Sequence, residues 1–232
     1  MSDEDKSSGK LLSSALFGLI VVGGLVFFWP SLIPFGFFEF WTIKGSVWEA
    51  AKNAWPIYLF GLGMNFRNLF RENDYVPDPH EILFGGFGIS LWAGIVEELC
   101  FRWLIFISAI VILPVTDWLL FQLTGIHVVQ WIYGFLCPIA NFFTLGYLEP
   151  YLLNGYGWAV GAAIISANGR FRNGHAYQGP VGFTVSWFLG MYFFWVLFTY
   201  GLIAAMTIHF LYNFFIFTLV FVDAVIEKRN GI

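Results

Sequence analysis

Charged side chains are scarce in this sequence, and no excess of basic residues is present. Only 11% of the 232 residues are charged, against about 25% in typical soluble domains, while 59% are hydrophobic. The net charge of −4 argues against a nucleic-acid partner, because such proteins present clustered positive charge. The shortage of charge and the apolar excess together predict a protein that lies within a lipid bilayer.

Cysteine is also scarce. The chain has 2 cysteines, Cys100 and Cys137, and both lie in apolar stretches. Two thiols in such positions argue against a disulfide framework, and their spacing does not match that of a zinc site. We expect both to be buried thiols in the core of the protein.

Long apolar runs are what the sequence does contain. A transmembrane helix needs about 20 apolar residues, and these runs are continuous, unlike the alternating segments of about 10 residues in a membrane β-barrel. We expect an all-α, polytopic transmembrane helical bundle of about seven spans, with six or eight also compatible, around a polar intramembrane cavity. The expected spans are residues 11–29, 47–66, 81–114, 128–148, a helix that starts at 158, 181–200 and 202–222.

All of these spans belong to one expected transmembrane domain, residues 11–222. The acidic segment 1–10 lacks the basic start of a secretory signal, so we expect a short disordered tail followed by a retained helix. Residues 65–80 are rich in Asn, Asp and Pro, which is typical of a loop outside the membrane. A short charged tail, 223–232, follows the last span. This organisation predicts a multi-pass integral protein of the cell (inner) membrane.

The apolar run 81–114 is longer than a bilayer requires. As one helix it would be about 50 Å long, against a hydrocarbon core of about 30 Å. We therefore expect it to tilt, to protrude, or to kink at Gly85-Gly86 or at Gly88. Residues 117–125 are expected to form a loop or a short surface helix.

Three ionisable residues, Glu97, Glu98 and Arg102, interrupt this apolar run. A charge at bilayer depth costs about 2.5–3.5 kcal/mol on insertion scales, so such residues pair, face water or take part in chemistry. Glu98 and Arg102 are four residues apart and share a helix face, whereas Glu97 is turned by about 100° and is left over. The motif predicts either a salt bridge that locks helices together or a functional site with Glu97 as its reactive carboxylate.

Two further pairs of residues show the four-residue spacing of one helical turn. Phe171 and His175 form the first pair, and this histidine is either functional or a surface or capping residue. His209 and Asn213 form the second pair, inside the last span. They are either functional or a source of helix-bridging hydrogen bonds, which contribute about 0.6–2 kcal/mol in membranes. No role is assigned to the polar residues at expected loops and span ends, which are His80, Asp117, His127 and Glu149.

Together the three motifs contain the groups that peptide hydrolysis requires. The reaction needs a base for water, a proton for the leaving amine and donors for the developing oxyanion. Glu97 with His175 is suited to hold and activate the water, and His209 with Asn213 is suited to donate to the oxyanion. Cys100 is a weaker candidate nucleophile, because a thiol buried among apolar residues is hard to ionise.

The three motifs, in this order, resemble those of the CPBP family, the CAAX prenyl proteases and bacteriocin-processing (Abi) proteins, which are intramembrane glutamate proteases. The resemblance rests on Glu-Glu-x-x-x-Arg at 97–102, Phe-x-x-x-His at 171–175 and His-x-x-x-Asn at 209–213. It covers a catalytic core of about residues 82–217, and it implies a helical bundle around a conical, water-filled cavity open to one membrane face. The first two motifs lie further apart than is usual in the family, which predicts an insertion at 114–155.

The resemblance also implies a role for each motif residue. Glu97 would be the catalytic base, and His175 would help to activate the water. His209 and Asn213 would form the oxyanion site. Structural support would come from the remaining motif residues, which are Glu98, Arg102 and Phe171.

Three classes of function therefore compete. The first is an intramembrane endopeptidase that acts on a peptide or protein substrate at the membrane. The second is a non-proteolytic member of such a family, acting as an immunity, regulatory or scaffold protein. The third is a proton-coupled transporter that uses Glu97 and Glu98, although the sequence shows no inverted repeat.

Cofactors and partners follow from the same residues. No cofactor is expected, but zinc is not excluded, because Glu97, His175 and His209 together are a His₂Glu ligand set. The expected partners are a peptide or protein substrate and membrane lipid, with no nucleic acid.

Overall fold

A computed structural model describes residues 38–65 and 78–230, together with parts of the segment 13–36. The expected N-terminal tail, most of the first expected span and most of the polar loop before His80 lie outside the described residues. Within the described part every regular element is a helix, which confirms the all-α prediction there.

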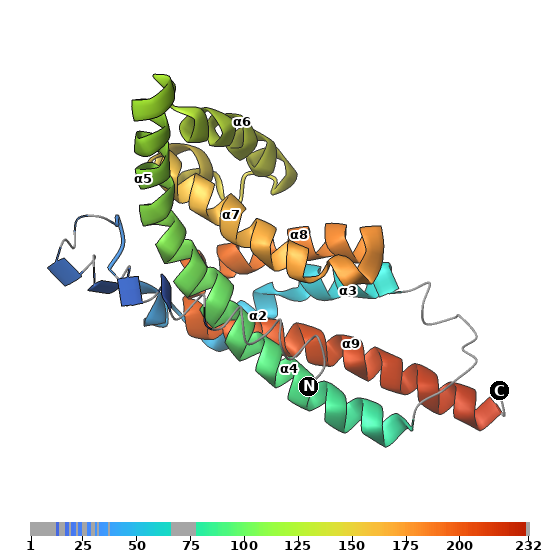
Figure 1. The fold of residues 1–232 in the computed structure, drawn as a ribbon. Coiled ribbons are helices and arrows are strands. Elements are labelled where there is room, and N and C mark those ends of the chain that lie inside the picture. The colour runs from blue at the N-terminus through green and yellow to red at the C-terminus, as the bar shows by residue number, and fades with distance from the viewer. Residues whose placement is uncertain are drawn as a thin grey trace.

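The described helices follow one another closely along the chain (Figure 1). In order, they are η2 Glu39–Trp41, α2 Val47–Asn53, α3 Trp55–Asn65, α4 Pro79–Glu97, η4 Glu98–Ile105, α5 Phe106–Thr124, α6 Val128–Phe143, η5 Pro150–Asn154, α7 Trp158–Gly174, η6 Ala176–Gln178, α8 Gly179–Tyr200 and α9 Leu202–Asn230. The elements η4 and η5 are π-helical, while η2 and η6 are short 3₁₀ helices.

Three helical stretches of the described chain are long and apolar enough to cross a membrane, and they are Pro79–Thr124, Ala176–Tyr200 and Leu202–Lys228. Two shorter apolar helices lie where the sequence predicted full spans. The expected span 47–66 is divided into α2 and α3. The expected span 128–148 contains α6, which has only 16 residues. A helix of that length measures about 24 Å, short of a hydrocarbon core of about 30 Å.

The longest helical stretch comprises α4, η4 and α5 without interruption. Asp78 starts it by accepting a hydrogen bond from the backbone N–H of His80 at 2.9 Å, with Pro79 as the first helical residue. It ends at Thr124, where Gly125 adopts a left-handed φ of 71°. The helix thus continues from Asp117 to Thr124, where we expected a loop or a short surface helix, because the apolar segment after Asp117 extends it.

This long helix changes direction between α4 and α5 (Figure 1). The bend coincides with η4, whose π-helical turns interrupt the α-helical hydrogen-bond pattern. The expected kink sites Gly85, Gly86 and Gly88 lie inside regular α4 instead. The change of direction therefore occurs at the segment that contains Glu98 and Arg102.

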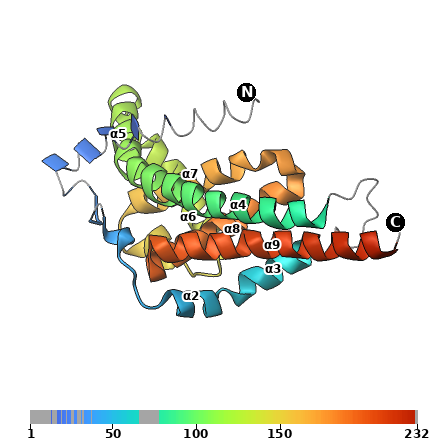
Figure 2. The same ribbon diagram turned by 90° about the horizontal axis from the view of Figure 1, so that it is seen from below.

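Helices α4 and α9 lie side by side along much of their length (Figures 1 and 2). Glycine permits the close approach, because a Cβ atom on Gly94 would lie 2.9 Å from the carbonyl oxygen of Met206 and 3.0 Å from the backbone nitrogen of Phe210. Small residues at such contacts are typical of helix packing in membranes. The contact brings the C-terminal end of α4 against the N-terminal third of α9.

Helix α7 packs against α5, α6 and α8 and contributes to the largest apolar core of the described chain. Phe106, Ile164, Phe194 and Leu197 are fully buried there. Cys100 and Cys137 are both free and buried, which confirms the prediction of core thiols. In lipid, such contacts stabilise through van der Waals packing, because burial of apolar surface from water is not the driving force between membrane helices.

Candidate functional site

The π-helical segment η4 places Glu98 and Arg102 in the centre of the bundle. Both side chains are fully buried, and Nε of Arg102 lies 3.3 Å from Oε2 of Glu98. This is the ion pair that the four-residue spacing predicts. π-Helical turns are rare and frequently lie at functional sites.

His209 joins this ion pair from α9. Its Nδ1 atom lies 2.7 Å from Oε1 of Glu98, and its ring stacks on Phe193 with centroids 4.5 Å apart. Because a carboxylate accepts hydrogen bonds, this contact places a proton on Nδ1. The other ring nitrogen, Nε2, then points towards the end of α4.

Glu97 lies at that end of α4. Its Oε2 atom is 3.8 Å from Nε2 of His209, and 28% of its side chain is exposed, whereas Glu98 is fully buried. The Oε2 atom itself is buried and has no hydrogen-bond partner among the described residues. A separation of 3.8 Å is too long for a direct hydrogen bond but still within ion-pair distance. The structure thus separates the two glutamates as helical geometry predicts, with Glu98 paired and Glu97 left over.

Aromatic rings surround the guanidinium of Arg102. Its central carbon lies 4.1 Å from the ring centre of Phe171, 5.3 Å from that of Phe193 and 5.7 Å from that of Phe194. Cation–π attraction is strengthened when the cation is desolvated. The rings and Glu98 together offset part of the cost of a buried charge, although the guanidinium nitrogens have no hydrogen-bond acceptor within the described chain.

Phe171 connects the remaining motif residues. Its ring centre lies 4.6 Å from that of His175 and 6.2 Å from that of His209. The Nδ1 atom of His175 is 2.9 Å from the backbone oxygen of Phe171, and the ring is half-buried at the end of α7. Among the described residues no hydrogen bond or ion pair joins His175 to Glu97 or His209. The ring of Phe171 is thus a neighbour of both histidines.

Asn213 lies one helical turn beyond His209 on α9 and is half-buried. No hydrogen bond of its side chain is found within the described chain. The structure therefore brings Glu97, Glu98, Arg102 and His209 into one cluster, but it does not join Asn213 to it directly. We refer to these four residues as the Glu98 cluster.

Asn168 is a buried polar residue to which sequence reasoning assigned no role. It is fully buried, its Nδ2 atom donates to the backbone oxygen of Trp187 at 3.0 Å, and its Oδ1 atom has no partner in the described part. Its Oδ1 atom lies so close to Gly190 that a Cβ there would overlap it. The sequence feature that could have pointed to Asn168 is its spacing, which places it on the same helix face as Phe171 and His175.

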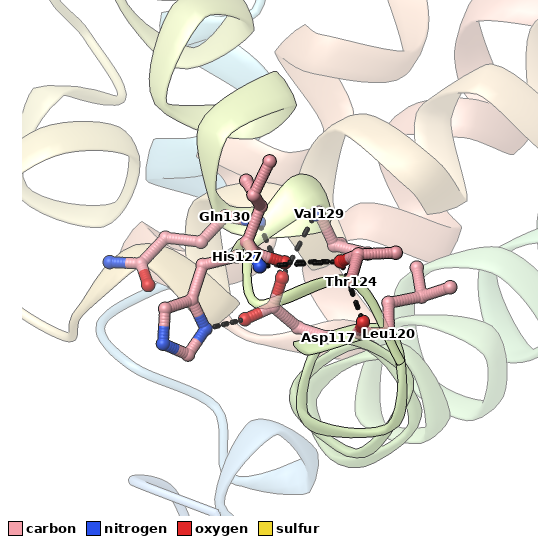
Figure 3. Close-up of polar contacts among 7 residues, drawn as sticks. Asp117, Leu120, Thr124, His127, Val129 and Gln130 are labelled. Carbon is pink, nitrogen blue, oxygen red and sulfur yellow. Dashed lines mark hydrogen bonds and ion pairs between the residues drawn. The ribbon is translucent and has the colours of Figure 1, made fainter. Parts of the chain in front are cut away.

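A second carboxylate–histidine pair joins α5 to α6 (Figure 3). Oδ2 of buried Asp117 lies 2.6 Å from Nδ1 of His127, and Oδ1 accepts from the backbone N–H groups of Val129 at 2.9 Å and Gln130 at 3.1 Å. The ring of His127 stacks on Phe121 with centroids 4.3 Å apart. Asp117 thus caps the first turn of α6 from a neighbouring helix.

Metal ligands and cavities complete the description of the site. No group of three His, Cys, Asp or Glu side chains gathers as a metal site within the described ranges, so Glu97, His175 and His209 do not form a ligand set there. A cavity of about 1260 Å³ lies between α5, α6, α7 and α8. Its lining contains none of the three residues, and it does not contain Asn213.

Comparison with known proteins gives no relative. The chain matches no family model, no curated protein and no solved structure. What can be said of function therefore rests on the arrangement of the chain's own residues.

Proposed function

We propose that this protein is an intramembrane endopeptidase of the CPBP type, which hydrolyses a peptide bond near the membrane surface. One observation supports this most strongly. His209 lies between two carboxylates, with Nδ1 bonded to Glu98 and Nε2 facing the partly exposed Glu97 across 3.8 Å. This arrangement contains the groups of an acid–base site, because Glu98 orients the imidazole and Glu97 has an oxygen without a hydrogen-bond partner among the described residues.

In the proposed reaction Glu97 is the base. It takes a proton from a water molecule whose oxygen attacks the substrate carbonyl carbon, and it later passes that proton to the leaving amine as the carbon–nitrogen bond breaks. His175 helps to hold the water, and Asn213 and His209 donate to the oxyanion. Glu98 stabilises the protonated imidazole of His209, and Arg102 keeps Glu98 in place.

The proposal includes the membrane setting. It places the Glu98 cluster beside a polar cavity in a multi-pass bundle of about seven spans in the cell (inner) membrane. The three membrane-length helices support this setting, since Glu97 closes α4 in one of them and His209 lies in another. The substrate is a peptide or protein at the membrane, and no metal takes part.

Replacement of Glu97 by Gln tests the proposal. Glutamine has nearly the same shape but cannot accept the proton, so we expect cleavage to fall by about 10²–10⁴-fold while the protein still inserts. The measurement compares the peptides released from membranes that contain wild-type protein with those from membranes that contain the variant. Glu81→Gln is the matched control, because Glu81 is an exposed carboxylate in the first turn of the same helix.

Two results would contradict the assignment. Full activity of Glu97→Gln would show that another group is the base. Loss of activity on treatment with a chelator, together with stoichiometric zinc in the purified protein, would show a metal mechanism in place of the proposed one.

A second candidate is a non-proteolytic immunity, regulatory or scaffold protein. The observation that favours it is the position of the 1260 Å³ cavity, whose lining contains none of the proposed catalytic residues. On this alternative the Glu98 cluster is a structural ion pair, and Glu97→Gln leaves the biological effect of the protein unchanged. The same variant therefore separates the two candidates.

A further inference from the structure

The cavity between α5, α6, α7 and α8 lies on the other face of α7 from the Glu98 cluster. Phe171 and Asn168 face the buried core, whereas Ile165, Ser166 and Gly169 line the cavity. With a volume of about 1260 Å³ it exceeds the roughly 300–1,000 Å³ of pockets for drug-sized ligands. A ligand of this cavity is therefore large, and its binding is independent of the proposed peptidase chemistry.

The wall of the cavity is predominantly apolar. Aliphatic and aromatic side chains from η4 and from the four helices form it, and they include Leu104, Ala109, Leu136, Ile165, Trp187 and Phe188. The hydroxyl of Tyr133 and that of Ser166 lie 2.6 Å apart, so these two groups in the wall satisfy each other. An apolar chain fits such a wall, because it requires no hydrogen bond from it.

One end of the cavity is cationic. Arg170 and Arg172 line it near the C-terminal end of α7, next to Asn173. Neither guanidinium forms an ion pair with a carboxylate of the described chain. Arg172 contacts Oδ1 of Asn173 at 3.1 and 3.3 Å, and it lies 4.2 Å from the ring centre of Phe183. Two arginines without a carboxylate partner at the end of an apolar cavity match a ligand with an anionic head.

We infer that this cavity binds an anionic glycerophospholipid, with an acyl chain between α5, α6 and α8 and the phosphate against Arg170 and Arg172. The guanidinium group suits this ligand because its planar set of donors matches phosphate oxygens. The acyl chain supplies the apolar contact that the wall requires. The inference stands whether or not the protein is a peptidase.

Mass spectrometry of the intact, delipidated protein tests the inference. The full chain is incubated with equal amounts of phosphatidylglycerol and phosphatidylcholine that have the same acyl chains, and the retained lipid is identified. We expect one retained phosphatidylglycerol per chain. The preference over phosphatidylcholine should fall about fivefold for each arginine in Arg170→Gln and Arg172→Gln, and Lys52→Gln, an exposed cation on α2, should leave it unchanged.

A second variant and a competitor test the acyl-chain part of the site. Ala109→Phe fills the cavity from its wall without changing a charge, and it should abolish retention of the lipid while helical content is kept. Inorganic phosphate should not displace the bound lipid, because it lacks an acyl chain.

Four outcomes would overturn the inference. They are equal retention of the two lipids, an unchanged preference in both arginine variants, complete displacement by inorganic phosphate, and a lipid-free dimer in which a second copy fills the cavity.

Discussion

Two carboxylate–histidine pairs in this protein have nearly the same bond and very different surroundings. Glu98 Oε1 lies 2.7 Å from Nδ1 of His209, and Asp117 Oδ2 lies 2.6 Å from Nδ1 of His127. Both carboxylates are buried, so the difference comes from the atoms around each pair.

In the Asp117 pair each carboxylate oxygen has a defined partner. One oxygen faces the histidine, and the other accepts from two backbone N–H groups at the start of α6 (Figure 3). The side chain of His127 is 53% exposed, and the outer face of its ring reaches solvent. A carboxylate whose bonds are complete in this way is a cap, and it holds two helices together.

In the Glu98 cluster the bonds are incomplete. Oε2 of Glu97 and the guanidinium nitrogens of Arg102 have no hydrogen-bond partner among the described residues, although all are buried. Unsatisfied buried polar groups cost free energy, and they are found where strain or chemistry requires them. The comparison therefore teaches that the bond between carboxylate and histidine does not by itself distinguish the two pairs, whereas the hydrogen bonding of the surrounding polar groups does.

The largest expected effect is that of Glu98→Gln. Removal of the negative charge leaves Arg102 buried without a counter-ion, so the free energy of unfolding should fall by about 3–5 kcal/mol. Thermal unfolding in detergent measures it. The double variant Glu98→Leu with Arg102→Met should recover most of the loss, because apolar replacement of a whole buried pair is close to neutral. A double variant no more stable than Glu98→Gln would disprove the ion-pair explanation.

The next effect is that of Gly94→Val, which separates α4 from α9. The added side chain meets the backbone of Met206 and Phe210, so unfolding free energy should fall by about 1–3 kcal/mol. The distance between Glu97 and His209 should increase, and peptide cleavage should fall with it. Gly85→Val is the matched control in the same helix, because a Cβ on Gly85 has no atom within 4 Å.

Gly94→Val and its control Gly85→Val also test whether the Glu98–His209 and Asp117–His127 pairs are independent. Hydrogen exchange at the amides of Val129 and Gln130 reports on the Asp117 cap, which joins α5 to α6 and not α4 to α9. We expect Gly94→Val to leave this exchange unchanged. Faster exchange at both amides would mean that the two pairs are mechanically coupled.

A smaller effect is expected from Asp117→Ala. The amides of Val129 and Gln130 lose their acceptor, so their hydrogen exchange should accelerate and the melting temperature should fall by less than in Glu98→Gln. Asp117→Asn is the control, because its amide oxygen still accepts both bonds. Peptide cleavage should be unaffected by either change, and a loss comparable to that of Glu97→Gln would assign Asp117 to the site instead.

The smallest effect is expected from His127→Phe. Phenylalanine keeps the stacking on Phe121 and removes only the bond to Asp117, whose other oxygen still caps α6. A single hydrogen bond of this kind contributes about 0.5–1.5 kcal/mol. Thermal unfolding should therefore shift by little, and a shift as large as that of Asp117→Ala would mean that the histidine is essential to the cap.

Much of the Glu98 cluster could be predicted from the sequence. The four-residue spacing of Glu98 and Arg102 predicted their ion pair. The rotation of about 100° between consecutive helical residues predicted that Glu97 lies outside this pair. Both predictions depend only on local helix geometry, and the π-helical turns of η4 still leave Glu98 and Arg102 in contact. The burial of Cys100 and Cys137 followed from their apolar surroundings in the same way.

Other features could not be predicted locally. The contact between His209 and Glu98 spans 111 residues of sequence, and no spacing rule reaches so far. The position of His175 depends on where α7 ends, and the role of Asp117 depends on α6 turning back against α5. The continuation of the helix to Thr124 differs from the expected end at Pro114, because this proline lies inside α5 without ending it.

The sequence by itself determined a helical, apolar chain and the pairing of residues one turn apart, because composition and helical periodicity are local properties. Only the tertiary structure decided which histidine meets which carboxylate. Glycines on α4 allow α9 to approach closely enough to bring His209 to Glu98 and within 3.8 Å of Glu97. Packing distances of this kind are fixed by the fit of whole helices, and that fit is a property of the assembled bundle.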